Sequence, residues 1–118
     1  MARFHHLGKE AERQARLYLQ QKGHLLLETN YRFDHKEIDI ISLAGEVLVF
    51  TEIKARSSYG FGYPEEAVGM QKQAFMKQAA EWYCSCHPQY TMIRFDVISI
   101  LMEKGSITEL LHFEDAFY

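Results

Sequence analysis

The sequence predicts a single α+β or mixed α/β domain in which helices cover a central sheet. Residues 7–22 and 69–86 carry apolar side chains at spacings of three and four, which is typical of helices with one buried face. Residues 25–33, 37–54 and 93–113 are rich in Ile, Val, Leu and Phe, which favours strands. A chain of 118 residues can build one hydrophobic core, so one domain over residues 1–118 is expected.

The first predicted helix places Glu12 at the margin of its apolar stripe and ends before Gly23. Glu12 is therefore either a surface residue paired with Arg16 one turn later or an acid that faces a site. The stripe itself consists of Leu7, Ala11, Ala15, Tyr18 and Leu19.

Residues 37–54 predict two strands joined by a turn at Ala44–Gly45. Because side chains alternate along a strand, one face of the second strand carries Leu48, Phe50, Glu52 and Lys54. By the same rule, Glu37, Asp39 and Ile41 share a face of the first strand. If both strands turn their charges the same way, Asp39, Glu52 and Lys54 meet at one end of an apolar hairpin.

This grouping of charges fits metal-assisted phosphodiester hydrolysis. Two neighbouring carboxylates disfavour each other's ionised form, and a divalent cation between them reverses that penalty. Mg²⁺ takes oxygen ligands and usually binds one or two carboxylates together with waters and phosphate. Lys54 would add a cation for a phosphate oxygen or for the attacking water. The alternative is that Glu52 and Lys54 are solvated neighbours on an edge strand.

The second predicted helix, residues 69–86, carries Lys72 in its first turn, where the helix dipole disfavours a cation. Lys72 either faces a site or extends past apolar neighbours to water. The expected buried side of the helix consists of Phe75, Met76, Ala79, Trp82 and Tyr83.

Two further strands are expected over residues 93–101 and 107–113, with a turn at residues 103–106. Arg94 and Asp96 share a face of the first of these strands and are interpreted as a structural ion pair or an edge feature, not as catalytic residues.

Two other segments contain residues that could bind a ligand. The loop at residues 55–64 carries Tyr59, Phe61 and Tyr63, which either stack bases or cover the core. Cys84 and Cys86 are interpreted as free thiols, because a structural zinc site needs a second pair of ligands.

The formal net charge of −3 counts against a protein that coats nucleic acid non-specifically, but it does not exclude a local basic surface. No apolar run reaches the length of a membrane span, and no signal peptide precedes the first helix. A cytoplasmic protein without a membrane partner is therefore expected.

An ordered set of motifs runs through about nine tenths of the chain: Leu7-Gly8, Glu12, Ala15, Gly23, Asn30-Tyr31-Arg32, Glu37-Ile38-Asp39, Val49 to Arg56, Gly62, Ala67-Val68, Lys72 and Arg94 to Val97. This set resembles the YraN-like family of uncharacterised bacterial proteins. That family lies within the PD-(D/E)XK nuclease superfamily and is distantly similar to archaeal Holliday junction resolvases. The sequence departs from the family pattern at Ala11 and Lys36, where Gly is usual.

The resemblance implies a restriction-endonuclease-like α-β-β-β-α-β core, with a central mixed sheet flanked by helices. It also implies an endonuclease that depends on Mg²⁺ or Mn²⁺ and acts on DNA, including branched or junction DNA. Asp39 and Glu52 would hold the metal, with the Ile53 carbonyl as a further ligand. Glu12 or Glu37 would support the metal through waters. Lys54 would position the water or stabilise developing charge, and Lys72 is a recurrent motif position near the site.

A second hypothesis keeps the same fold without hydrolysis. In it the protein is a catalytically silent nucleic-acid-binding or interaction module, which the acidic net charge favours. Because the related resolvases act as symmetric dimers, a possible homodimer is also expected.

Overall fold

The predicted order of helices and strands is confirmed. A computed structural model describes residues 2–57 and 68–118, with side chains from residue 8 onward. Tyr59, Phe61 and Tyr63 of the aromatic loop lie outside the described residues. The elements are α1 (Ala2–Gln21), β1 (Leu25–Phe33), β2 (Lys36–Ala44), β3 (Val47–Arg56), α2 (Met70–Cys86), β4 (Met92–Glu103) and β5 (Ser106–Phe117).

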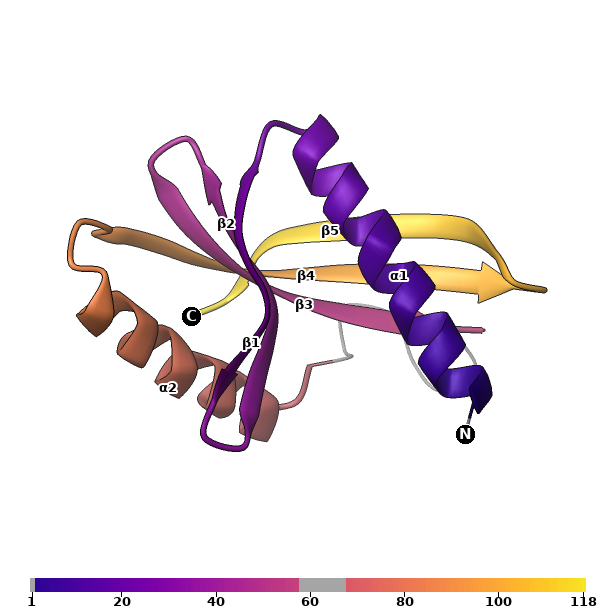
Figure 1. The fold of residues 1–118 in the computed structure, drawn as a ribbon, viewed down its shortest axis with the longest axis horizontal. Coiled ribbons are helices and arrows are strands. Elements are labelled where there is room, and N and C mark those ends of the chain that lie inside the picture. Colours follow the sequence, from indigo (N-terminus) through magenta and orange to yellow (C-terminus); the bar gives the residue numbers. More distant parts are fainter. Residues whose placement is uncertain (1, 58–67) are drawn as a thin grey trace.

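The five strands form one mixed sheet in the order β1-β2-β3-β4-β5. Neighbouring strands are antiparallel except β3 and β4, which run parallel from the pair Val47↔Met92 to the pair Arg56↔Leu101. A parallel pair needs a long crossover connection, and α2 lies within it. This α+β architecture is consistent with a restriction-endonuclease-like core (Figure 1).

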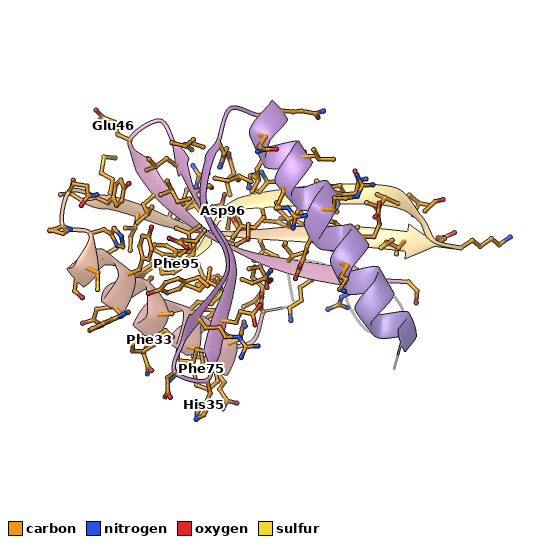
Figure 2. The ribbon with its side chains drawn as sticks, in the orientation of Figure 1. Phe33, His35, Glu46, Phe75, Phe95 and Asp96 are labelled. Atoms are coloured by element: carbon orange, nitrogen blue, oxygen red, sulfur yellow. The ribbon has the colours of Figure 1, made fainter. Side chains whose placement is uncertain are left out.

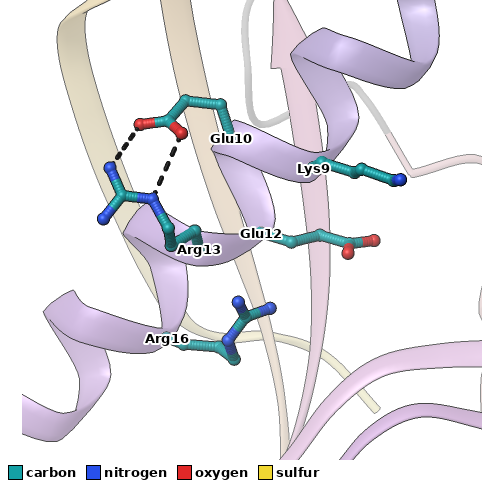
Figure 3. A pocket seen from close by; sticks show the side chains of 5 residues that line it. All are labelled: Lys9, Glu10, Glu12, Arg13 and Arg16. Carbon is teal, nitrogen blue, oxygen red and sulfur yellow. Dashed lines mark hydrogen bonds and ion pairs between the residues drawn. The ribbon is translucent and has the colours of Figure 1, made fainter.

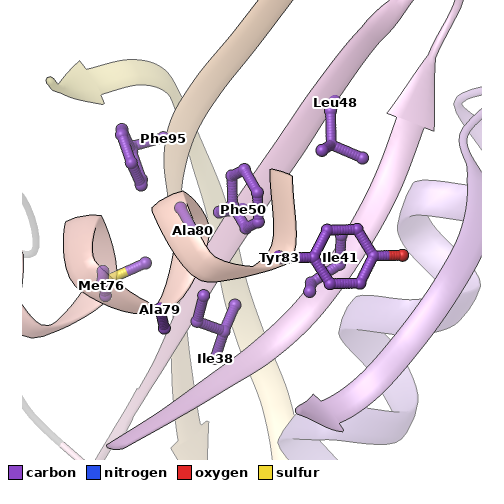
Figure 4. Close-up of a cluster of buried hydrophobic side chains, with 9 residues drawn as sticks. All are labelled: Ile38, Ile41, Leu48, Phe50, Met76, Ala79, Ala80, Tyr83 and Phe95. Carbon is purple, nitrogen blue, oxygen red and sulfur yellow. The ribbon is translucent and has the colours of Figure 1, made fainter. Parts of the chain in front are cut away.

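Each helix covers its own hydrophobic cluster, and the two clusters lie on opposite faces of the sheet. In β4, Phe95 belongs to the α2 cluster, whereas Ile98 and Ile100 belong to the α1 cluster, as alternation along a strand requires. The buried α2 cluster is Ile38, Ile41, Leu48, Phe50, Met76, Ala79, Ala80, Tyr83 and Phe95 (Figure 4). The buried α1 cluster is Ala11, Ala15, Leu19, Ile40, Ile98, Ile100 and Met102.

The predicted alternation is confirmed in β3 and wrong in β2. Leu48 and Phe50 both pack under α2. In β2, however, Ile41 packs with Ile38 under α2, whereas Ile40 packs under α1, so Ile41 does not share a face with Asp39. The regular alternation is interrupted at Asp39, because β2 pairs with β3 only from Ile40↔Thr51 to Ala44↔Val47. Before Ile40, the strand bends away with β1.

The prediction that Trp82 is buried is wrong. Its side chain is 50% exposed, and the buried residues of α2 are Met76, Ala79, Ala80 and Tyr83. Trp82 instead stacks on Phe33 near the tip of the β1–β2 hairpin, with ring centroids 5.7 Å apart. At the same tip, the Lys36 ammonium lies over the rings of Phe33 and Phe75, which are labelled in Figure 2.

Several element boundaries differ from their predictions, and the loop expected from residue 55 begins later because β3 continues to Arg56. Helix α1 begins at Ala2 rather than at residue 7, and β5 continues to Phe117 rather than ending at residue 113. In the β1–β2 turn, Asp34 takes the left-handed conformation (φ 60°). Lys36 is the first residue of β2 and does not have a positive φ. The Gly that is usual at this position in the YraN-like family is therefore not required here.

A buried polar network anchors the C-terminal half of α1 to β4 and β5. Asp96, labelled in Figure 2, accepts hydrogen bonds from Arg94 Nε (2.8 Å), Arg94 Nη2 (2.9 Å), His112 Nε2 (2.7 Å) and the Asp115 N–H (3.0 Å). The predicted ion pair of Arg94 and Asp96 is thus confirmed. On the other side of its ring, His112 Nδ1 lies 3.1 Å from both Tyr18 Oη of α1 and Lys22 Nζ. Lys22 belongs to the turn that directly follows α1. Because its ammonium can only donate, Nδ1 accepts and Nε2 carries the proton.

The network lowers the pKa of Asp96. Burial alone would raise it, but the hydrogen bonds from His112, Arg94 and the Asp115 N–H outweigh burial and bring the pKa to about 2. The pKa of Asp in an unfolded chain is about 3.9. The stabilisation is therefore present above about pH 4 and is lost as the pH falls toward about 2.

We expect Asp96→Asn to lower the free energy of unfolding by about 3 kcal/mol at neutral pH, because it removes the buried partner of the Arg94 guanidinium and leaves only the half-exposed Glu114, 3.5 Å away. The matched control is Asp115→Asn, which also removes one carboxylate charge but keeps the backbone N–H of residue 115 that donates to Asp96. It should change stability by about 0.5 kcal/mol or less. Urea unfolding followed by circular dichroism measures both variants, and equal losses would contradict the assignment.

Candidate functional site

The candidate site lies where β2 and β3 separate. Continued antiparallel pairing beyond Ile40↔Thr51 would place Ile38 opposite Ile53. Instead, the Ile53 N–H donates to Asp39 Oδ2 over 2.7 Å, so a side-chain carboxylate takes the place of a backbone acceptor. Asp39 is thereby fixed at the point of separation.

Asp39 and Glu52 form a hydrogen-bonded carboxyl pair at this point. Burial is the largest cause that raises the pKa of Asp39, and the hydrogen bond and negative charge of Glu52 raise it further, to about 8. The Ile53 N–H and the charge of Lys72 act in the opposite direction. Near neutral pH Asp39 therefore carries a proton, which a nearby positive charge would displace.

Two lysines approach the same pair from β3 and α2. Glu52 Oε2 lies 3.3 Å from Lys72 Nζ and 3.9 Å from Lys54 Nζ. Lys72 also donates to the Glu37 carbonyl over 3.3 Å. The Glu52 side chain is 5% exposed, whereas those of Lys54 and Lys72 are 34% and 33% exposed. Strand β3 lies between β2 and β4, so the alternative of a solvated edge-strand pair does not hold.

Glu12 of α1 and Glu37 of β2 join the site through Asn30, which the sequence reasoning had not selected. When the Asn30 amide is oriented so that its nitrogen faces the two acids, it donates to Glu12 Oε1 over 3.2 Å and to Glu37 Oε1 over 2.9 Å. Among the described side chains, no ion pair within 4.0 Å joins Glu12 to Arg16, which removes the alternative of a surface salt bridge. The structure thus brings both acids, and not one of them, to the site.

Basic side chains of α1 flank Glu12. In Figure 3, Lys9, Glu12 and Arg16 project away from the pair formed by Glu10 and Arg13. Arg13 is neutralised by Glu10 through two hydrogen bonds of 2.8 and 3.2 Å. No such pair within 4.0 Å involves Lys9 or Arg16 in the part of the chain that the structure describes. All five residues line one shallow pocket on the helix.

The oxygen donors suit a hard divalent cation only with additional ligands. Asp39 and Glu52 supply the carboxylates, and Ile53, whose carbonyl was predicted as a ligand, lies in β3 between Glu52 and Lys54. Over residues 8–57 and 68–118, no group of three or more His, Cys, Asp or Glu side chains is arranged to hold a metal ion by itself. Mg²⁺ commonly binds to one or two carboxylates and completes its octahedron with water and phosphate. The donor set therefore fits Mg²⁺ or Mn²⁺ bound together with a phosphate-containing substrate.

The chain was compared with known proteins. The sequence pattern of the Uncharacterised protein family UPF0102 matches residues 11–100. A UPF0102 protein of Natranaerobius thermophilus is 42% identical over 113 residues, which cover 93% of this chain and 95% of that protein. A second UPF0102 protein, from Flavobacterium psychrophilum, is 40% identical over 118 residues, covering 100% of this chain and 98% of that protein.

The chain belongs to the UPF0102 family. The part matched by the UPF0102 pattern includes every residue of the candidate site, from Glu12 on α1 to Lys72 on α2. Within the described parts of this UPF0102 protein, no helix is both long enough and apolar enough to cross a bilayer.

The carboxyl pair makes the stability of the metal-free protein depend on pH. The folded pKa of Asp39, about 8, lies above the unfolded value of about 3.9. The contribution of Asp39 is therefore complete below about pH 4 and is lost as the pH rises through about 8. We expect the melting temperature to fall by several degrees over that range in EDTA.

In Asp39→Asn this fall should be absent, because the amide cannot ionise but can still accept the Ile53 N–H and donate to Glu52. The variant should be at least as stable as the wild type at about pH 8. Differential scanning fluorimetry across the pH range measures both. Parallel curves for the two proteins would show that Asp39 titrates normally.

Proposed function

We propose that this UPF0102 protein is a divalent-metal-dependent endonuclease that hydrolyses phosphodiester bonds in DNA, including branched or junction DNA. The observation that carries the proposal is the carboxyl pair of Asp39 and Glu52, held between two strands and faced by two lysines. This arrangement supports membership of the PD-(D/E)XK superfamily and the distant similarity to junction resolvases.

The chemistry of the pair favours a cation. Because burial and the charge of Glu52 raise the pKa of Asp39 to about 8, a divalent cation held between the two side chains would displace the proton of Asp39 and supply the missing positive charge. Asp39 and Glu52 would hold Mg²⁺ or Mn²⁺, with the Ile53 carbonyl as a further ligand. When bound, the ion would polarise a phosphoryl oxygen and offset the charge that develops in the transition state.

The side chains around the pair would perform the remaining tasks. Lys54, one-third exposed and on the same strand face as Glu52, would orient the attacking water or stabilise charge on the phosphate. Lys72 would hold the Glu52 carboxylate in place through its 3.3 Å contact. Glu12 and Glu37 would hold waters at the edge of the site.

A nucleic acid partner is supported by the distribution of charge rather than by its total. The net charge is −3, yet Lys54 and Lys72 lie at the carboxyl pair, and Lys9 and Arg16 flank Glu12. Phosphates that flank the scissile bond would meet these cations. A homodimer remains a prediction.

The test is Mn²⁺-dependent cleavage of a four-way junction, a flap, a single strand, a plain duplex and RNA. We expect Lys54→Ala to lower the cleavage rate by about 100-fold with a small change in affinity, because it removes a contact made in the transition state. Glu52→Gln should abolish cleavage. The matched control is Lys77→Ala, an exposed lysine of α2 that lies over Tyr118, and it should cleave like the wild type.

Two outcomes would contradict the proposal. Cleavage that survives Glu52→Gln would come from a contaminant. Absence of cleavage on every substrate, together with measurable binding of junction or duplex, would favour the silent nucleic-acid-binding module on the same fold.

DNA binding without divalent ions tests the α1 surface separately. We expect Arg16→Gln, made in the Glu52→Gln protein, to reduce the slope of log affinity against log salt by about one, as loss of one phosphate contact does. Arg13→Gln removes the same charge from the same helix, but Glu10 already neutralises it, so its slope should not change. Fluorescence anisotropy at several salt concentrations measures the slopes. Equal slopes for the two variants would place the DNA elsewhere.

A further inference from the structure

Asn30 occupies a special backbone position directly opposite Asp39. The β1–β2 register pairs Thr29 with Ile40 and Tyr31 with Ile38, which leaves Asn30 facing Asp39 across the hairpin. Its φ of 52° lies in the left-handed region, which most residues avoid inside a strand. Such local strain is a marker of functional sites when the surrounding structure holds it in place.

The amide of Asn30 uses both of its N–H groups on carboxylates from different elements. It donates to Glu12 Oε1 of α1 and to Glu37 Oε1 of β2. The opposite orientation would point the amide oxygen at two carboxylate oxygens, so hydrogen bonding decides the orientation. One side chain therefore joins the helix acid to the strand acid beside Asp39.

The electrostatics show what this amide offsets. Burial and the negative charge of Asp39 raise the pKa of Glu12, and the charge of Glu37 raises it further. The hydrogen bond from Asn30 is the largest cause acting in the opposite direction, ahead of the charge of Arg16. Without the amide, two mutually repelling acids would face each other across the gap between α1 and β2.

We propose that Asn30 is a positioning residue that holds Glu12 and Glu37 side by side at the edge of the Asp39–Glu52 pair. This inference rests on the proposed function in one respect, namely that the two acids then serve a cation. Asn30 makes no contact with a reacting atom and acts through the acids that it orders.

The chemistry of the position explains why the residue is Asn. Gly would accept the left-handed backbone but has no side chain to donate. Asp would also tolerate the backbone but would place a third carboxylate where two donors are needed. Ala would lose the donors and strain the backbone as well. Asn meets both requirements.

These differences define the experiment. Asn30→Gly keeps the backbone conformation and removes the amide, so it separates the two roles, and Asn30→Ala is the matched variant that removes both. The pKa of Glu12 is measured by ¹³C NMR titration of its carboxyl group in EDTA, and Mn²⁺ affinity is measured by calorimetry. Thermal unfolding reports the strain.

In Asn30→Gly we expect the pKa of Glu12 to rise measurably above that of the wild type, because a hydrogen bond to its charged form is lost. Mn²⁺ affinity should fall, and the melting temperature should change little. Asn30→Asp should raise the pKa of Glu12 further. Asn30→Ala should raise it as Gly does and also lower the melting temperature.

An unchanged pKa of Glu12 in Asn30→Gly would overturn the proposal and would make Asn30 a backbone residue only. This outcome is separable from failure of the proposed function. If the wild type neither binds Mn²⁺ nor cleaves DNA, the nuclease proposal fails, while the pKa of Glu12 still decides the role of Asn30.

Discussion

The hydrogen bond from the Ile53 N–H to the Asp39 carboxylate terminates the pairing of β2 with β3, and much of the molecule depends on it. Because a side chain satisfies this backbone donor, β2 can leave β3 without an unpaired N–H group between them. Strand β2 then follows β1 and places Ile38 under α2, while β3 continues beside β4. The separation that gives each helix its own cluster also creates the space in which the carboxyl pair lies.

Helix α1 is held firmly enough to present Glu12 at a fixed position. Its small residues Ala11 and Ala15 are fully buried, so the helix lies close to the sheet. Further along, Tyr18 and Lys22 contact His112, which is itself bound to Asp96. The polar network of β4 and β5 therefore supports the site indirectly, although it lies at the other end of the helix.

Periodicity and composition could predict the elements and half of the site. The face shared by Glu52 and Lys54, and the position of Lys72 in the first turn of α2, follow from local rules and are confirmed. The error at Ile41 arose because strict alternation assumes that a strand keeps its partner. The error at Trp82 arose because an aromatic ring can cover a neighbouring Phe without being buried by it. Asn30 and His112 depend on contacts between distant parts of the chain, which no spacing rule encodes. For Asn30, the one local signal was the tolerance of Asn for a left-handed backbone.

The two outer strands of the sheet have one property in common. Asn30 in β1 and Asp115 in β5 both adopt the left-handed conformation, with φ of 52° and 54°, and each strand also has a register shift against its neighbour. These irregularities break the even spacing of N–H and C=O groups along both outer borders. A second chain therefore finds no long, flat border on which to add a strand, which protects the protein against edge-to-edge aggregation. The left-handed backbone at Asn30 therefore has two effects: it places the amide beside the acids, and it interrupts the outer edge of β1.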